Sequence, residues 1–235
     1  MPVRSSPPIP RLADVEPLDL PKLQRATLND EVYAELKRAI MAGAIEPGRS
    51  MTIRSLAASF GVSLMPVREA LGRLVAERVL ELLPNRSVAV PVLDRVRFHE
   101  VTRIRLALEG LAVREGARNI GEHELAQMIA WNEEMEAPET ARSAKALDLN
   151  REIHYMLYRA AGMPTLYGMI ETLWLQIGPL LTIHMRSILD HQPSTLQQHH
   201  RDAFAAISAG DAEAAAAAIV ADIEAAAVTI DWTLS

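Results

Sequence analysis

Three arginines on two neighbouring predicted helices have the charge and spacing to bind DNA. Arg54 falls in a helix expected at Ile53–Phe60, and Arg68 and Arg73 fall in the next helix, expected at Met65–Arg78. The apolar residues of both segments recur at helical spacing, so burying them leaves the arginines on the outer faces. A helix pair with a basic second helix suits the DNA major groove, where an arginine bound to guanine contributes about 1–3 kcal/mol of discrimination. These residues therefore predict binding to double-stranded DNA.

A second group of polar residues lies in the C-terminal half. Asn150 and His154 are four residues apart in a predicted helix, so their side chains project from one face. His200 lies on a later helix and Asp222 on the last one, and the three helices could line one core. A single histidine on a helix is usually a hydrogen-bonded surface or core residue. We prefer that ordinary interpretation for His99, His123, His184 and His191.

The turn between the two N-terminal helices follows from its residue types. Gly61 ends the first helix, because glycine takes the left-handed backbone conformation that a tight turn needs. Ser63 can cap the second helix, and Pro66 falls in its first turn, where no backbone donor is lost. An earlier helix is expected at Asn29–Ala42.

A two-stranded ribbon is expected after the helix pair, with strands at Leu80–Leu83 and Val88–Pro91. The loop between them carries Asn85 and Arg86, which would enter the minor groove or touch the DNA backbone. At the start of the second helix, a backbone amide can meet a phosphate. The full predicted DNA-binding set is Arg54, Ser63, Met65, Arg68, Arg73, Asn85 and Arg86.

The charge of the chain is divided unevenly between its two parts. The 235 residues carry a net charge of −6, which is unexpected for a DNA-binding protein. However, residues 1–92 hold 12 basic and 10 acidic residues, whereas residues 93–235 hold 12 and 20. This asymmetry indicates a nucleic-acid-binding module attached to a module with another role. The chain has no cysteine and no run of about 18 apolar residues, so we expect a cytoplasmic protein without a membrane span.

The acidic part is predicted to be entirely helical. Glycine, proline and Gly-Asp breaks separate six segments with helical periodicity, at Val96–Arg118, Glu122–Glu136, Ala141–Ala161, Pro164–Leu189, Pro193–Ala209 and Ala212–Trp232. Six antiparallel helices form a bundle. The predicted fold is therefore mainly α, with a disordered tail at 1–26, a winged helix-turn-helix at 27–92 and an all-α antiparallel helical bundle at 95–233.

Two sets of motifs resemble known families. The run G-V-S-x-x-P-V-R-E-A-L-x-R-L, with I-E-P-G before it and P-N-R after it, resembles the winged helix-turn-helix of GntR-type bacterial transcription regulators over Leu28–Val92. Leu64 stands where that family commonly has an arginine that contacts DNA, and Ser87 where it often has glycine. The C-terminal half resembles the FCD ligand-binding domain of the FadR-type subfamily, through Arg105–Glu109, Asn150–His154 and His200–Asp211.

The FCD resemblance implies a metal site. In that family an Asp or Asn and three histidines hold a metal, and the first three positions match Asn150, His154 and His200. The fourth position, usually histidine, is Asp222 here, and His199 replaces His200 if the register slips by one. An amide oxygen, two imidazoles and a carboxylate can hold a divalent cation, most readily zinc, with manganese or nickel as alternatives. If Asp222 instead faces solvent, the metal is weakly bound or lost.

Arg105 is the candidate for effector binding. Its guanidinium could form a planar fork that matches a carboxylate, and with the metal it would hold a small carboxylate metabolite. The alternative is an ion pair with Glu109 at the favourable four-residue spacing. A single head makes too few contacts for a specific DNA site, so we expect a homodimer, whose two-fold symmetry requires a near-palindromic operator. The resemblance also implies a repressor that is released by its ligand.

Two other functions are weighed against a ligand-responsive regulator. One is a constitutive DNA-binding protein whose bundle only dimerises. The other is a metal-dependent enzyme with a DNA-binding appendage, which would need a general base beside the metal. The sequence contains no H-E-x-x-H motif, nucleophile elbow or phosphate-binding loop, so we predict that the protein is not an enzyme.

Overall fold

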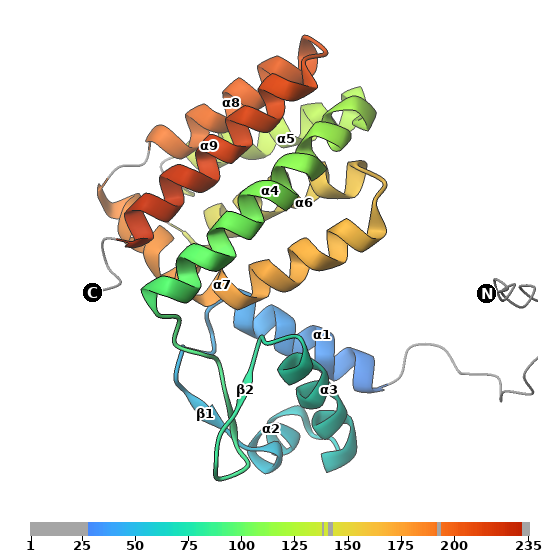
Figure 1. The fold of residues 1–235 in the computed structure, drawn as a ribbon, viewed down its shortest axis with the longest axis vertical. Helices are drawn as coiled ribbons and strands as arrows, with labels where there is room; N and C mark the ends of the chain where they lie inside the picture. The colour runs from blue at the N-terminus through green and yellow to red at the C-terminus, as the bar shows by residue number, and fades with distance from the viewer. Residues whose placement is uncertain (1–27, 138, 141–142, 192–193, 232–235) are drawn as a thin grey trace, which may run out of the picture.

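The N-terminal domain is a three-helix unit with a small sheet. The computed structural model describes residues 28–137, 139–140, 143–191 and 194–231, with side chains described outside 181–196. The predicted tail at 1–26 lies outside these residues. The domain, called the head below, contains α1 (Leu28–Met41), β1 (Ser50–Met51), α2 (Ile53–Phe60), α3 (Leu64–Ala76), β2 (Glu81–Leu82) and β3 (Val88–Ala89). Helices α2 and α3 and the β2–β3 hairpin form the expected winged helix-turn-helix (Figure 1).

The sheet has one strand more than predicted. Strand β1 pairs antiparallel with β3, placing Ser50 opposite Ala89, and β3 also pairs with β2, giving the order β1-β3-β2. The hydroxyls of Ser50 and Ser87 lie 2.7 Å apart and join the loop end of the hairpin to β1. The wing is therefore attached to β1 through its second strand, β3.

The turn between α2 and α3 forms as expected, with one difference in capping. Gly61 has a φ of 66°, the left-handed conformation predicted for it. Ser63 occupies the N-cap position of α3, but its side chain makes no capping hydrogen bond. A capping box instead begins α2, where Thr52 and Ser55 exchange hydrogen bonds.

The C-terminal domain, called the body, is a helical bundle. It contains α4 (Arg95–Asn119), α5 (Glu122–Glu136), α6 (Ala144–Ala160), α7 (Pro164–His191), α8 (Ser194–Ser208) and α9 (Ala212–Asp231). Helix α4 packs along α9 and crosses α6, and α7 lies between the bundle and the head (Figure 1). In the described part of the chain, no helix is both long and apolar enough to cross a membrane.

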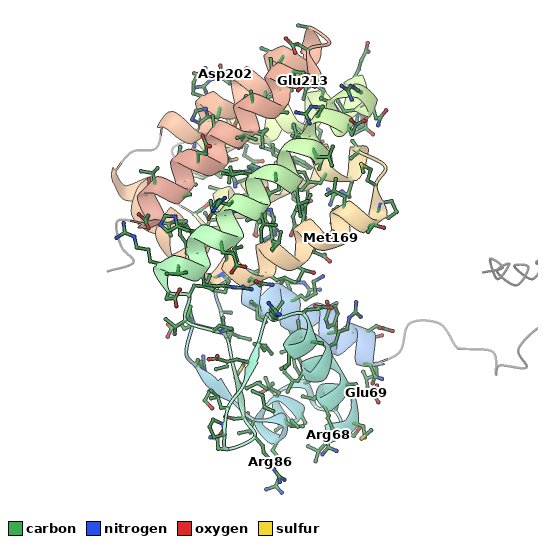
Figure 2. All side chains as sticks on the ribbon, in the orientation of Figure 1. Arg68, Glu69, Arg86, Met169, Asp202 and Glu213 are labelled. Atoms are coloured by element: carbon green, nitrogen blue, oxygen red, sulfur yellow. The ribbon has the colours of Figure 1, made fainter. Side chains whose placement is uncertain are left out.

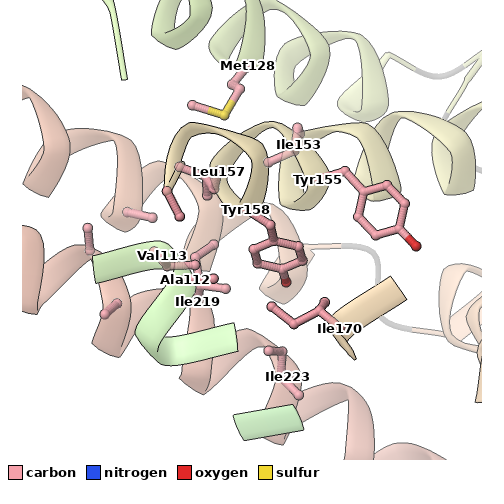
Figure 3. Packing of buried hydrophobic residues seen from close by; sticks show 14 of the residues in the cluster. Ala112, Val113, Met128, Ile153, Tyr155, Leu157, Tyr158, Ile170, Ile219 and Ile223 are labelled. Carbon is pink, nitrogen blue, oxygen red and sulfur yellow. The ribbon is translucent and has the colours of Figure 1, made fainter. Parts of the chain in front are cut away.

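The core of the body is built from all six of its helices, α4 to α9. Its largest fully buried side chains include Tyr158, Met128, Ile153 and Leu157, which interdigitate between the helices (Figure 3). At the crossing of α4 and α6, a Cβ on Gly116 would collide with the carbonyl oxygen of Leu157, so only glycine allows this approach. The close packing fixes which residues of these helices face one another.

Candidate DNA-binding surface and metal centre

Arginines gather at the end of the head that is farthest from the body. Arg68 projects from α3 and Arg86 from the wing, both into solvent (Figure 2). Arg54 is exposed in the first turn of α2. The start of α3 also exposes two apolar side chains, since Leu64 is 43% and Met65 56% exposed. This face combines cations with apolar groups that can contact thymine methyl groups.

Arg73 lies in a different environment from the other arginines. Its guanidinium carbon is 3.7 Å from the centroid of the Tyr33 ring, and its Nε donates to Glu77 at 3.1 Å. A further contact of 3.9 Å joins it to Asp30. These contacts fasten the C-terminal end of α3 to α1.

Asn85 shapes the wing. Its Oδ1 accepts hydrogen bonds from the backbone N–H of Ser87 at 3.0 Å and from the Ser87 hydroxyl. Arg86 between them has a φ of 61°, a left-handed conformation in the tight turn. The wing thus holds Arg86 at its tip through the Asn85 side chain.

The body brings together three of the four predicted metal ligands. His154 of α6, His200 of α8 and Asp222 of α9 each present a possible ligand atom, and these atoms lie within 4.8 Å of one another. The Nε2 of His154 is 3.4 Å from the Nε2 of His200 and 3.3 Å from the Oδ2 of Asp222. All three residues are at most 4% exposed. Asp222 therefore points into the core and not to solvent.

The outer nitrogens of both imidazoles are held by neighbouring side chains. The Nδ1 of His154 is 3.0 Å from the hydroxyl of Tyr158, which donates its only proton to Glu109. The Nδ1 of His200 is 2.9 Å from the Oδ1 of Asn132. In both contacts the partner is an acceptor, so Nδ1 carries the proton and Nε2 presents its lone pair.

These residues fit a cation. Two imidazole lone pairs and a carboxylate face one another, and the inner atoms of this cluster include no donor to separate them. The Oδ1 of Asp222 and the Oδ1 of Asn150, one turn before His154, are buried without a hydrogen-bond partner among the described residues. Buried acceptors without donors are costly unless a positive charge lies between them. A divalent metal held by N and O ligands would satisfy them.

The ionisation of the cluster agrees with this assignment. Burial lowers the pKa of His200 to about 4, although the Asp222 carboxylate opposes the shift. Burial acts to raise the pKa of Asp222, but the contacts of its carboxylate with His154 and the nearby His200 outweigh burial and lower this pKa. The described cluster therefore presents a neutral imidazole and a carboxylate at neutral pH, the forms that bind metals. His199, the alternative to His200, is outside the cluster.

Arg105 forms the ion pair that its four-residue spacing allowed. It is 4% exposed, and its Nε and Nη2 donate to Glu109 at 2.5 and 3.3 Å. Its guanidinium also lies over the Trp174 ring, 4.8 Å from the centroid. Glu109 is fully buried and joins Arg105 to Tyr158 and, through it, to His154.

The supporting residues were not predicted as part of the site. The four-residue spacing gave the Arg105–Glu109 pair, and the same spacing between His154 and Tyr158 could have indicated that contact too. Asn132 and Trp174 come from α5 and α7, and only the packing of the helices brings them to the cluster.

The comparisons with known proteins cover both domains. Residues 28–90 match the family described as bacterial regulatory proteins, gntR family, and residues 100–225 match the FCD domain. The chain is 32% identical to the HTH-type transcriptional regulator McbR of Escherichia coli over 179 residues, which is 76% of this chain and 80% of McbR. It is 26% identical to the transcriptional repressor RspR of the same organism over 193 residues, covering 80% and 82% of the two chains.

Solved structures agree with these matches. The structure of Escherichia coli McbR/YncC superimposes with a TM-score of 0.78 at 27% identity, covering 89% of this chain and all of that one. A putative GntR regulator from Rhodococcus sp. RHA1 has the same fold, with a TM-score of 0.71 at 22% identity over 86% and 96% of the chains. The chain therefore belongs to the GntR family of bacterial transcription regulators, in the group whose DNA-binding head is followed by an FCD domain.

Proposed function

We propose that this GntR-family protein is a ligand-responsive repressor whose body binds a small carboxylate through a divalent metal. Zinc is the first candidate, and Asn150, His154, His200 and Asp222 would hold it. The metal would supply a Lewis-acidic position for a ligand oxygen. The name of RspR as a repressor supports this direction of regulation. The observation that carries the proposal is the position of α7, which contacts both the candidate metal centre and the head.

One face of α7 belongs to the candidate metal centre. The ring of Trp174 lies 5.5 Å from that of His154 and under the guanidinium of Arg105. A ligand on the metal side of these residues would change the surroundings of the Trp174 ring. Trp174 is 5% exposed, so its ring has little room to move independently of the helix.

The other face of α7 belongs to the head. Leu175, next to Trp174, is 1% exposed and packs in the hydrophobic cluster of the head. Gln176 donates from Nε2 to the backbone carbonyl of Glu77, the C-cap of α3, at 3.1 Å. Lys37 of α1 pairs with Glu171 at 2.5 Å.

Three consecutive residues, 174–176, therefore join the metal centre to the end of the recognition helix. A small displacement of α7 by a bound ligand would move the head as a unit, because the contacts on both sides are buried or paired. In a dimer, such a displacement would change whether both α3 helices fit successive half-sites of a near-palindromic operator. A purely dimerising body would have no need of this connection, so the position of α7 favours the ligand-responsive function over the constitutive one.

Binding to DNA is tested on genomic fragments of the source organism. The fragments used are those that the immobilised protein retains from a mixture. For a selected fragment, Arg68→Ala should weaken binding by about 5- to 150-fold, the loss expected for one arginine–guanine contact. Affinity measured across a series of salt concentrations should fall steeply as salt rises, because Lys and Arg contacts to phosphate release counterions.

The matched control is Arg118→Ala, which removes an exposed arginine of α4 in the body and should leave DNA affinity unchanged. Binding that is insensitive to salt, or equal effects of the two substitutions, would contradict the assignment of the DNA-binding surface.

A further inference from the structure

Several buried polar side-chain atoms of the body have no hydrogen-bond partner among the described residues, and they include both acceptors and donors. The acceptors are Asn150 Oδ1 on α6, Gln197 Oε1 on α8 and Asp222 Oδ1 on α9. Two donors also lack a partner among the described residues: the Trp174 indole Nε1 on α7 and the Thr102 hydroxyl on α4. Both donor residues are more than nine-tenths buried. A cation held by the proposed ligands explains the acceptors of Asn150 and Asp222 but not the donors.

The two donors lie beside Arg105. Thr102 precedes Arg105 by one turn of α4, so both project from the same face of the helix. The Trp174 ring lies under the guanidinium of Arg105 and contacts the ring of His154 at a tilt. A buried N–H or O–H without an acceptor costs about 1–3 kcal/mol, so a group that accepts from both donors would be bound favourably.

Arg105 is less suited to hold the ligand than its residue type indicates. Two of its three guanidinium nitrogens donate to Glu109, and the carboxylate of Glu109 neutralises its charge. A dication at the centre would be opposed by the single remaining carboxylate, that of Asp222, which leaves one positive charge. This charge balance favours a ligand with one carboxylate over a ligand with two.

We infer that the Trp174 indole N–H and the Thr102 hydroxyl bind the oxygen atoms of a monocarboxylate effector at the metal centre. This inference rests on the proposed metal-dependent ligand site and assigns its recognition residues. Arg105 then acts mainly as a positioning residue, holding the Trp174 ring and Glu109.

The test uses the full-length, zinc-loaded protein with acetate as the probe monocarboxylate. Three tryptophans give three indole N–H signals in a ¹⁵N–¹H correlation spectrum, and Trp174→Phe identifies one of them by its loss. Acetate should shift the Trp174 signal in a saturable way and leave that of Trp131 unchanged. After zinc is removed by a chelator, the same titration should produce no shift.

Two conservative substitutions measure the contributions of the donors. Trp174→Phe keeps an aromatic ring and Thr102→Val keeps the side-chain shape, and each should weaken acetate binding about tenfold, the value of one hydrogen bond to a charged group. Trp131→Phe is the matched control and should have no effect. Zinc content should be unchanged in all three variants.

The outcomes separate this inference from the proposed function. If both donor variants bind zinc and bind acetate with unchanged affinity, the assignment of Trp174 and Thr102 is wrong. The proposed metal site is supported in that case. A zinc-loaded protein that shows no saturable shift with acetate also overturns the inference. If the protein binds no zinc, the proposed function fails as well.

Discussion

Replacing His200 with alanine should lower zinc affinity by more than about 100-fold. Loss of a hydrogen bond that merely supports a metal ligand typically costs about 10- to 100-fold, and His200 would be a ligand itself. Its Nε2 faces His154, and its Nδ1 is fixed by Asn132, so no other side chain in the cluster can take its position. Metal analysis of protein purified without chelator should find about one zinc per chain in the natural protein and almost none in the variant.

Thermal unfolding provides a second measurement of the same substitution. A ligand that binds only the folded state raises the unfolding temperature, so added zinc should stabilise the natural protein and not His200→Ala. The matched control is His123→Ala, which removes an exposed histidine of α5. An equal zinc content and an equal thermal shift in all three proteins would exclude the proposed ligand set.

Replacing Glu109 with alanine should reduce the free energy of unfolding by about 3–5 kcal/mol. The substitution leaves Arg105 as a buried charge without its partner, and this is the costly way to break a buried ion pair. Tyr158 loses the acceptor of its hydroxyl at the same time. Unfolding in urea, followed by circular dichroism, measures the change.

Two comparisons show whether burial causes this loss. Glu115→Ala breaks an ion pair with Arg118 on the same helix that is largely solvent-accessible, and it should cost less than about 1 kcal/mol. The double variant Arg105→Met, Glu109→Leu removes both charges and should regain part of the stability. Similar losses of unfolding free energy in Glu109→Ala and Glu115→Ala would mean that the buried ion pair stabilises the protein no more than the exposed one.

The fold of the head could be predicted because its signals are local. Gly61 and the apolar stripes of α2 and α3 determine the helix-turn-helix within a short segment, and the bounds of α2 were predicted without error. Strand β1 was missed because Ser50–Met51 is a two-residue strand that exists only through its pairing with β3. Such pairing between distant residues leaves no periodicity in the sequence.

The same distinction applies to the site residues. The pattern of residues could place Arg68, Arg73 and Asn85 in the head, but it could not show that Arg73 stacks on Tyr33 or that Asn85 bonds within the wing. Residue type alone does not show which polar groups find partners inside the protein.

In the body, the four-residue spacings correctly indicated the Arg105–Glu109 pair. The meeting of His154, His200 and Asp222 was anticipated from the family resemblance together with helix placement, and the structure confirms that the three meet. The connection through α7 could not be predicted, because it depends on how the head and body pack.

The control of the head by the body is tested most directly by comparing DNA affinity when the metal centre is loaded and when it is empty. The zinc-loaded and chelator-treated proteins should differ by more than about fivefold in affinity for a selected genomic fragment, within the range typical of coupled sites. Gln176→Ala, which breaks the hydrogen bond from α7 to the end of α3, should reduce this difference. Equal DNA affinities for the two forms of the natural protein, with metal analysis showing one form loaded and the other empty, would contradict the claim that the body controls the head.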